Sequence, residues 1–160
     1  MKKVILIVLA VVVVALVAVL ALTGNNDNNS NKSVTCQELY EKIKDAVTLP
    51  EEMVARSSSD LDMRYGIDTT KATDYVFMAN ATSYYVDVIA IFKVENANDR
   101  KEFETSLSAI KKQAEDSMNN YDAEQYKIAK DGVVYTSGEY VILIMTSDVN
   151  GVKNVIKENI

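Results

Sequence analysis

The chain has 160 residues and a net charge of −6, from 17 Lys and Arg against 23 Asp and Glu. It contains no His and one Cys. These counts exclude an intrachain disulfide, a zinc site built from several thiolates of one chain, and any catalysis or metal binding that depends on His. An acidic chain without a Lys or Arg cluster also repels phosphate backbones, so we expect no nucleic-acid partner.

The N-terminal segment is strongly apolar. Lys2 and Lys3 precede an unbroken run of Val, Ile, Leu and Ala over residues 4–22, which as a helix spans roughly 29 Å, close to the hydrocarbon thickness of a bilayer. By the positive-inside rule, the rest of the chain lies outside the cytoplasm. We interpret residues 1–24 as a retained signal anchor of a single-pass membrane protein. The alternative is a cleaved signal peptide with an imperfect site at Val19-Leu20-Ala21.

Two further segments follow the anchor. Residues 25–33 contain only Asn, Asp, Ser and Lys and predict a flexible polar linker. Residues 34–160 have the length and apolar content of one domain with one core, and too few residues for two. With Lys2 and Lys3 set aside, the remainder of the chain carries a net charge of −8, which favours solubility and opposes tight binding to an anionic membrane surface.

A capping box at Thr35-Cys36-Gln37-Glu38 predicts the start of the first helix, and Leu49-Pro50 its end. Cys36 shares the apolar stripe of this helix with Leu39. A thiol activated by the helix N-terminus is one interpretation. We favour a small buried hydrophobic side chain, because no His is available as a base.

Residues 51–74 show no clear period. Asp60, Asp62 and Asp68 suggest calcium ligands, but the loop lacks the alternating ligands, central Gly and terminal Glu of the standard calcium loop. We therefore interpret them as solvated acidic side chains and predict no metal site and no cofactor.

Two strands are predicted over residues 75–81 and 85–94, which are rich in Val, Ile, Tyr and Phe. In the second strand, one face is apolar and holds Val86, Val88, Ala90, Phe92 and Val94. The other face mixes Tyr85, Asp87, Ile89, Ile91 and Lys93. This alternation predicts one face packed on helices and one face partly wet.

A long amphipathic helix follows. Asp99-Arg100-Lys101-Glu102 offers a capping box, and Asn119-Asn120 ends the pattern. A short helical turn is expected over residues 122–126. The apolar stripe of the long helix consists of Phe103, Leu107, Ile110, Ala114 and Met118.

A second hairpin is predicted over residues 133–136 and 139–146, across Ser137-Gly138. Residues 140–145 are continuously apolar, which is typical of a central strand covered on both faces. Asp148 caps a last helix. The sequence thus predicts an α+β fold with an antiparallel sheet of about four strands packed against helices, preceded by the transmembrane helix.

The order of several short motifs resembles a known family. Tyr65-Gly66-Ile67-Asp68 is followed by two strands, a long charged helix ending at Asn120-Tyr121, then Glu124-Gln125-Tyr126 and Gly138-Glu139-Tyr140-Val141. This succession resembles a domain-of-unknown-function family of small extracytoplasmic proteins of Gram-positive, Clostridia-like bacteria, over residues 34–160. Members are lipoproteins or carry an N-terminal anchor, so the resemblance implies an extracytoplasmic location. The chain departs from the lipoprotein form, since Asn25 stands where the acylated Cys would be. The resemblance implies no activity, substrate or catalytic residue.

Three functions remain open at this point. A binding or accessory module needs only a surface, and the acidic domain favours an envelope protein or wall component over an anionic partner. A carboxylate-dependent hydrolase needs two Asp or Glu residues, which an acidic chain always offers. A structural subunit would associate through its membrane helix. We favour the binding module and predict no catalytic residue, because no phosphate loop, nucleophile elbow or zinc helix occurs. The candidate contact residues are Tyr84, Tyr85, Tyr121, Tyr126, Tyr135 and Tyr140, although most of these can equally fill the edge of the core.

Overall fold

Residues 34–160 are described by the computed structural model of the chain. The predicted signal anchor over residues 1–24 and the predicted linker over residues 25–33 lie outside the described residues. Among the helices of residues 34–160, none has both the length and the apolar character that a membrane span requires.

The described residues form helices and an antiparallel sheet, which confirms the predicted α+β class. The α-helices are α2 (Cys36–Ala46), α3 (Ser58–Tyr65), α4 (Ala97–Met118), α5 (Ala123–Asp131) and α6 (Val149–Asn159), with one 3-10 turn, η1 (Thr69–Lys71). The strands are β1 (Met53–Ala55), β2 (Asp74–Asn80), β3 (Val88–Lys93), β4 (Val133–Ser137) and β5 (Tyr140–Met145).

The strands of residues 34–160 form one antiparallel sheet in the order β1-β2-β3-β5-β4. The two predicted hairpins, β2–β3 and β4–β5, are confirmed, and they join through β3 and β5, where Ala90 lies opposite Leu143. The predicted count of about four strands was one too low, because β1 pairs with the end of β2 and places Val54 opposite Ala79. Three residues are too few for an alternation to show in the sequence.

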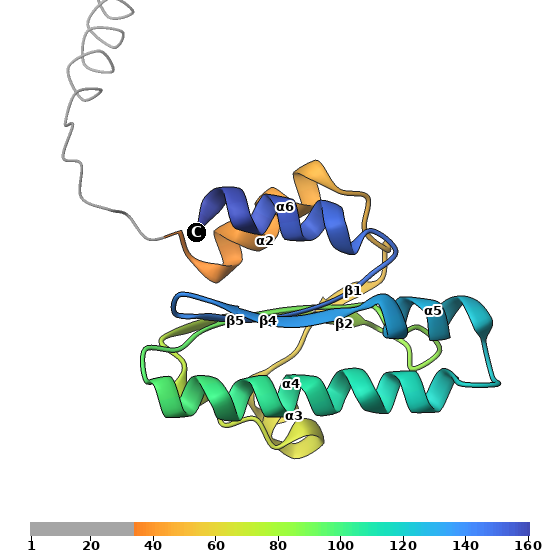
Figure 1. Ribbon diagram of the computed structural model, residues 1–160, viewed down its shortest axis with the longest axis horizontal. Helices are drawn as coiled ribbons and strands as arrows, with labels where there is room; N and C mark the ends of the chain where they lie inside the picture. The colour runs from red at the N-terminus through yellow and green to blue at the C-terminus, as the bar shows by residue number, and fades with distance from the viewer. Residues whose placement is uncertain (1–33) are drawn as a thin grey trace, which may run out of the picture. The chain divides into compact units, whose positions relative to one another are not determined.

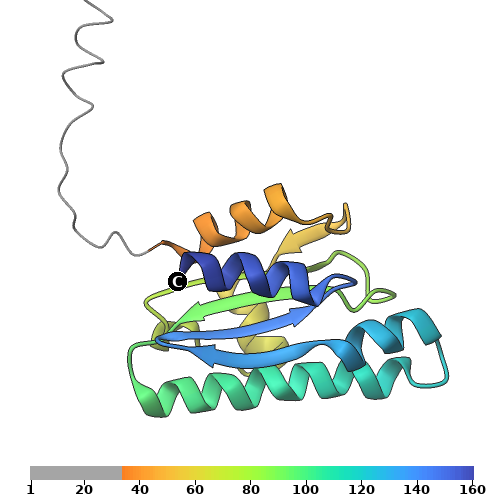
Figure 2. The ribbon, with the colours of Figure 1, turned by 45° about the horizontal axis from the view of Figure 1, so that its top comes forward.

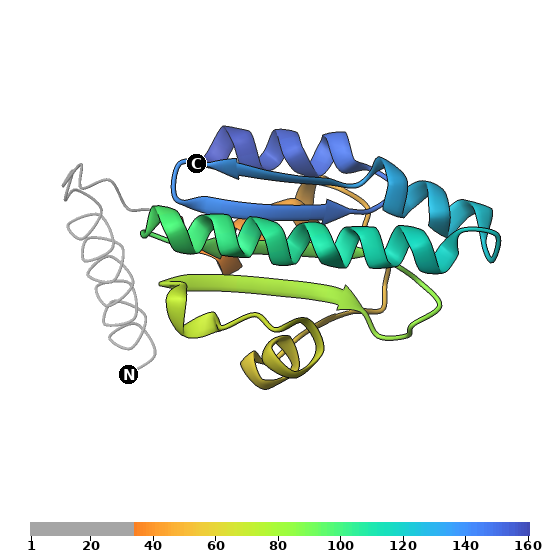
Figure 3. The same ribbon diagram turned by 60° about the horizontal axis from the view of Figure 1, so that its bottom comes forward.

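Helices cover both faces of the sheet. Figures 1 and 2 show α2 and α6 over one face, where they pack against each other, and Figure 3 shows α4 crossing the opposite face with α3 beside β2. The prediction of a partly wet sheet face was therefore wrong. Ile89 and Ile91 were expected there, and both are fully buried beneath α2 and α6. The face looked half-polar in the sequence because it carries polar side chains at its two ends, Asp87 and Lys93. The residues between them on this face are apolar.

Local signals set most helix boundaries. The Thr35 hydroxyl accepts a hydrogen bond from the Glu38 N–H at 3.1 Å, and Glu38 Oε2 accepts one from the Thr35 N–H at 3.0 Å, which confirms the capping box of α2. α2 ends at Ala46, ahead of the predicted stop at Leu49-Pro50.

The predicted start of α4 at Asp99 was wrong. Asn96 caps the helix instead, because its Oδ1 accepts from the N–H groups of Asn98 and Asp99. Both Asn96 and Asp99 can cap a helix N-terminus. Capping at Asn96, which comes earlier in the chain, adds almost one turn to the helix. α5 was predicted as a single turn and is a full helix capped by Asp122.

The long helix packs along the sheet through its predicted stripe. Phe103, Leu107, Ile110 and Met118 are buried, and Ala114 is half-buried. At its N-terminal end, the Phe103 ring lies 4.8 Å from the Phe92 ring between centroids. The C-terminal half of the stripe, from Ile110 to Met118, faces the end of the sheet at which β2 turns into β3, and this end holds the candidate site.

Candidate functional site

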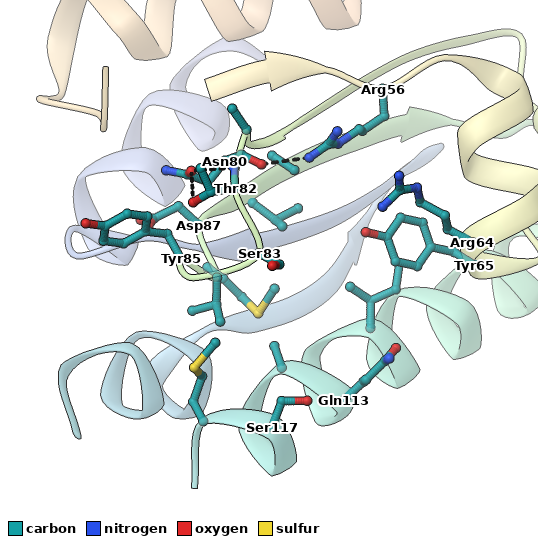
Figure 4. A pocket seen from close by; sticks show the side chains of 18 residues that line it. Arg56, Arg64, Tyr65, Asn80, Thr82, Ser83, Tyr85, Asp87, Gln113 and Ser117 are labelled. Atoms are coloured by element: carbon teal, nitrogen blue, oxygen red, sulfur yellow. Dashed lines mark hydrogen bonds between the residues drawn. The ribbon is translucent and has the colours of Figure 1, made fainter. Parts of the chain in front are cut away.

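A groove opens between α3, the C-terminal half of α4 and the loop that joins β2 to β3 (Figure 4). We call it the α3–α4 groove. Its volume is about 280 Å³. Two other hollows, beneath the end of α2 and between α5 and α6, are lined mostly by exposed side chains, whereas the α3–α4 groove reaches the apolar core.

Side chains from α4 and from the end of the sheet form the apolar floor of the groove. Ile110, Ala114 and Met118 come from α4, and Val88 and Met145 come from neighbouring strands. Ile110 and Met118 are nearly fully buried, so packing fixes their positions in this floor. An apolar floor of this kind with a few polar groups around it is the usual composition of a small-molecule site.

Two buried amide side chains hold the β2–β3 loop. Asn80 ends β2, and its Oδ1 accepts hydrogen bonds from the Thr82 N–H at 3.1 Å and the Thr82 hydroxyl at 3.3 Å. Gln125 on α5 accepts from the Val86 N–H through its Oε1 at 2.9 Å. Both amides are about 95% shielded from solvent. The loop is therefore fixed from two elements, which pre-organises this side of the groove.

Arg56 lies at the rim, just after β1. Its Nη2 donates to the backbone oxygen of Asn80 at 2.7 Å (Figure 4). Within residues 34–160 Arg56 forms no ion pair with a carboxylate, and its Nε is shielded from solvent without a hydrogen-bond partner. A half-buried guanidinium in this state retains donors that a ligand oxygen can use.

The second cation at the rim comes from α3. Arg64 and Tyr65 occupy the last turn of that helix, and both line the groove (Figure 4). Tyr65 is fixed by stacking on Phe77 with ring centroids 5.6 Å apart. Arg64 is exposed, and its Nε lies 3.8 Å from Asp60 Oδ1. An exposed contact at that distance contributes little and leaves the guanidinium available.

Asp87 ends the β2–β3 loop, and its side chain is only 4% exposed. Burial raises the pKa of this carboxyl; a hydrogen bond from its own backbone opposes the rise, and the negative charge of Glu124 adds to it. Val86 and Val88 belong to the core beneath α4, so the alternation of β3 turns Asp87 toward the face covered by α2 and α6. Continuing the strand register by one residue places it between Asn80 and Thr146, so three buried polar side chains cross the end of the sheet.

The tyrosines singled out from the sequence divide into two groups. Tyr84, Tyr85 and Tyr121 are exposed, and only Tyr85 lines the α3–α4 groove. Tyr126, Tyr135 and Tyr140 instead pack at the edge of the core. The hydroxyl of Tyr140, for example, donates to the Val34 oxygen at 3.1 Å.

Cys36 is fully buried, which confirms the interpretation as a small core side chain. Burial raises the pKa of its thiol to about 12, and the neighbouring Asp74 carboxylate contributes to the increase. A thiol with so high a pKa is a poor nucleophile at neutral pH.

Two of the three aspartates considered as calcium ligands serve local structure, and the third, Asp62, is exposed on α3. The Asp68 carboxylate accepts hydrogen bonds from the N–H and hydroxyl of Thr70, and Asp60 lies in the first turn of α3. No group of three or more His, Cys, Asp or Glu residues within residues 34–160 is placed to hold a metal ion.

Sequence reasoning missed Arg56, Arg64, Asn80 and Gln125. The first two lie in the stretch without a clear period; the position of Arg56 depends on the pairing of β1 with β2, and that of Arg64 on how α3 packs. One available signal was Asp87, a carboxylate between Val86 and Val88 inside an apolar run. It was interpreted as a mark of a wet face, whereas it is buried at the end of the sheet.

Comparisons with known proteins give one match. Residues 45–146 match the family described as Domain of unknown function (DUF4358). This range runs from the last turn of α2 to the residue after β5, so it includes the whole of the α3–α4 groove. No curated protein and no solved structure matches the chain.

Proposed function

The chain belongs to the DUF4358 family, a domain of unknown function, and we propose that it acts as a membrane-anchored binding module outside the cytoplasm, with the α3–α4 groove as its binding site. The apolar run behind Lys2 and Lys3 supports the anchor and its orientation. The resemblance to anchored extracytoplasmic proteins and lipoproteins of Gram-positive bacteria supports the same location. The partner is an envelope protein or a wall component.

The observation that carries this proposal is the state of Arg56. A half-buried guanidinium without a carboxylate partner in the described residues is costly for stability. Such a group is retained where a ligand supplies the missing partner. Its position at the rim of a groove with an apolar floor combines a specific polar contact with desolvated surface, as binding sites do.

The other two functions receive less support. Hydrolysis by paired carboxylates needs two acidic side chains flanking the substrate, with carboxyl groups about 5–9.5 Å apart, and Asp87 is the single carboxylate among the residues that line the α3–α4 groove. Association through the membrane helix concerns residues 1–24, which lie outside the described residues.

Photocrosslinking in intact cells tests the proposal. A photoreactive amino acid replaces Gln113, which lines the groove on α4, or Lys157, which is exposed on α6 over the opposite face. We expect a discrete adduct from position 113 and none from position 157. Added protease should digest the domain in intact spheroplasts. Equal adducts from both positions, no adduct from position 113, or a domain protected until lysis would contradict the proposal.

A further inference from the structure

The charge of the α3–α4 groove differs from that of the chain. The chain is acidic, yet the charged side chains that line the groove are Arg56, Arg64 and Asp87. Since the alternation of β3 directs Asp87 to the other face of the sheet, the two guanidinium groups dominate the groove. Figure 4 shows both arginine side chains at the same rim, on the side of α3 and β1.

The two arginines are prepared for an acceptor in different ways. Arg56 is held in place by its hydrogen bond to the Asn80 oxygen, and Nη1 has no hydrogen-bond partner among the described residues. Arg64 is exposed in the last turn of α3, and its only ion pair among the described residues, with Asp60, is long at 3.8 Å, so its guanidinium can turn toward a ligand. A fixed donor beside an adjustable one is suited to a planar anion with two oxygens.

From this geometry we propose that the α3–α4 groove binds a carboxylate, and that the ligand is a short peptide segment ending in a free C-terminal carboxylate. The inference rests on the proposed function of the groove as a binding site. The carboxylate pairs with Arg56 and Arg64, and the preceding residues lie over Ala114 and Met118. Gln113 and Ser117, on the same wall of α4, offer hydrogen-bonding groups to the peptide backbone.

Size and charge select this class of ligand. A volume of about 280 Å³ lies just below the range of roughly 300–1,000 Å³ typical of small-molecule sites, which suits a few small residues. A carboxylate carries one negative charge. A phosphate dianion carries more, and an acidic domain repels it more strongly.

Titration calorimetry of the full chain in detergent, with acetyl-alanyl-alanine as the probe, tests the proposal. The same peptide with a C-terminal amide is the matched ligand, because it differs only in the charged group. We expect the acid to bind and the amide to bind at least about ten-fold more weakly, as the loss of a charge-assisted pair implies. Inorganic phosphate should not displace the acid at equal concentration. Absence of binding by the acid, equal affinity for acid and amide, or displacement by phosphate would overturn the proposal.

Variants locate the binding. Arg56→Gln and Arg64→Gln should each weaken the acid about ten-fold or more and leave the amide unchanged. Lys157→Gln removes the same charge from α6 and should change neither. Arg64 is exposed, so its variant remains informative even if Arg56→Gln fails to fold. Unchanged affinity in Arg64→Gln and in a folded Arg56→Gln would overturn the assignment.

The experiments distinguish a failure of the proposed function from a failure of the proposed ligand. If crosslinks form at position 113 while acid and amide bind equally, the groove is a binding site for another class of ligand. If the acid binds through the two arginines and no adduct forms in cells, the ligand chemistry stands and the proposed cellular role fails.

Discussion

The two faces of the sheet differ most at the end where β2 turns into β3. Three polar side chains are buried in a row at this end: Asn80 at the end of β2, Asp87 just before β3 and Thr146 just after β5. The strand register directs them to the face covered by α2 and α6, although Asn80 and Asp87 also line the α3–α4 groove. On the opposite face, α3 and α4 leave a groove whose rim carries Arg56 and Arg64. One face is closed over its polar groups, and the other presents its polar groups to a ligand. The binding site is therefore inferred from which face leaves charged donors accessible, and the net charge of the chain serves only to favour a carboxylate over a phosphate.

Removal of a core side chain from the closed face should have the largest effect. Ile91 is fully buried beneath α2 and α6, so Ile91→Ala should lower the free energy of unfolding by about 2–5 kcal/mol. Urea denaturation followed by circular dichroism measures this. Thr136→Ala, at an exposed position of the edge strand β4, should stay within about 0.5 kcal/mol. If Ile91→Ala changed stability no more than Thr136→Ala, the face would be wet after all.

The groove wall formed by α3 depends on Gly66. This residue ends the helix with φ of 63°, in the left-handed region that glycine adopts without strain. Gly66→Ala should therefore cost about 1 kcal/mol, although the added methyl group meets no neighbouring atom. Met63→Ala, at an exposed position of the same helix, serves as the control in thermal melts. An unchanged melting temperature in Gly66→Ala would show that the end of α3 is not held in this conformation.

Substitution of Asp87 should have a smaller effect on stability, and this effect should depend on pH. A carboxyl whose pKa is raised on folding keeps its proton longer in the folded state. Its stabilising contribution is therefore present below the ordinary pKa of about 3.9 and is lost as the pH rises through the folded value. At pH 7 the buried charge is unfavourable, so Asp87→Asn should unfold at higher urea than the wild type, with the difference shrinking toward pH 4.

Asp62→Asn is the matched control for Asp87→Asn, because it makes the same change at an exposed position of α3. Its free energy of unfolding should change by less than about 0.5 kcal/mol at either pH. Loss of stability in Asp87→Asn at pH 7 would contradict this prediction. It would show that the carboxylate has a stabilising partner and that the buried polar row contributes to the stability of the fold.

Local patterns predicted much of the fold and little of the site. The stripe of α4 and the apolar alternation of β3 correctly indicated core residues such as Ile110 and Val88, which in the structure also form the groove floor. The capping box at Thr35 fixed the start of α2. These signals act over a few residues, so they can be read along the chain.

The remaining features depend on packing between distant elements. β1 is too short to show a period, and the position of Arg56 follows from its pairing with β2. The width of the groove is set by the separation of α3 and α4, which no local pattern encodes. Asp87 was assigned to a wet face because alternation reports only which residues share a face, and not what covers that face.

Amide chemical shifts during titration with acetyl-alanyl-alanine test the central claim, that the domain binds through the α3–α4 groove, most directly. The full chain labelled with ¹⁵N in detergent provides the spectra. The account predicts that the shifted amides cluster around residues 56, 64–65, 81–88 and 113–118, which surround the groove, while those of α2 and α6 stay unchanged. Shifts centred on α2 and α6, or no shifts at all at saturating peptide, would contradict it.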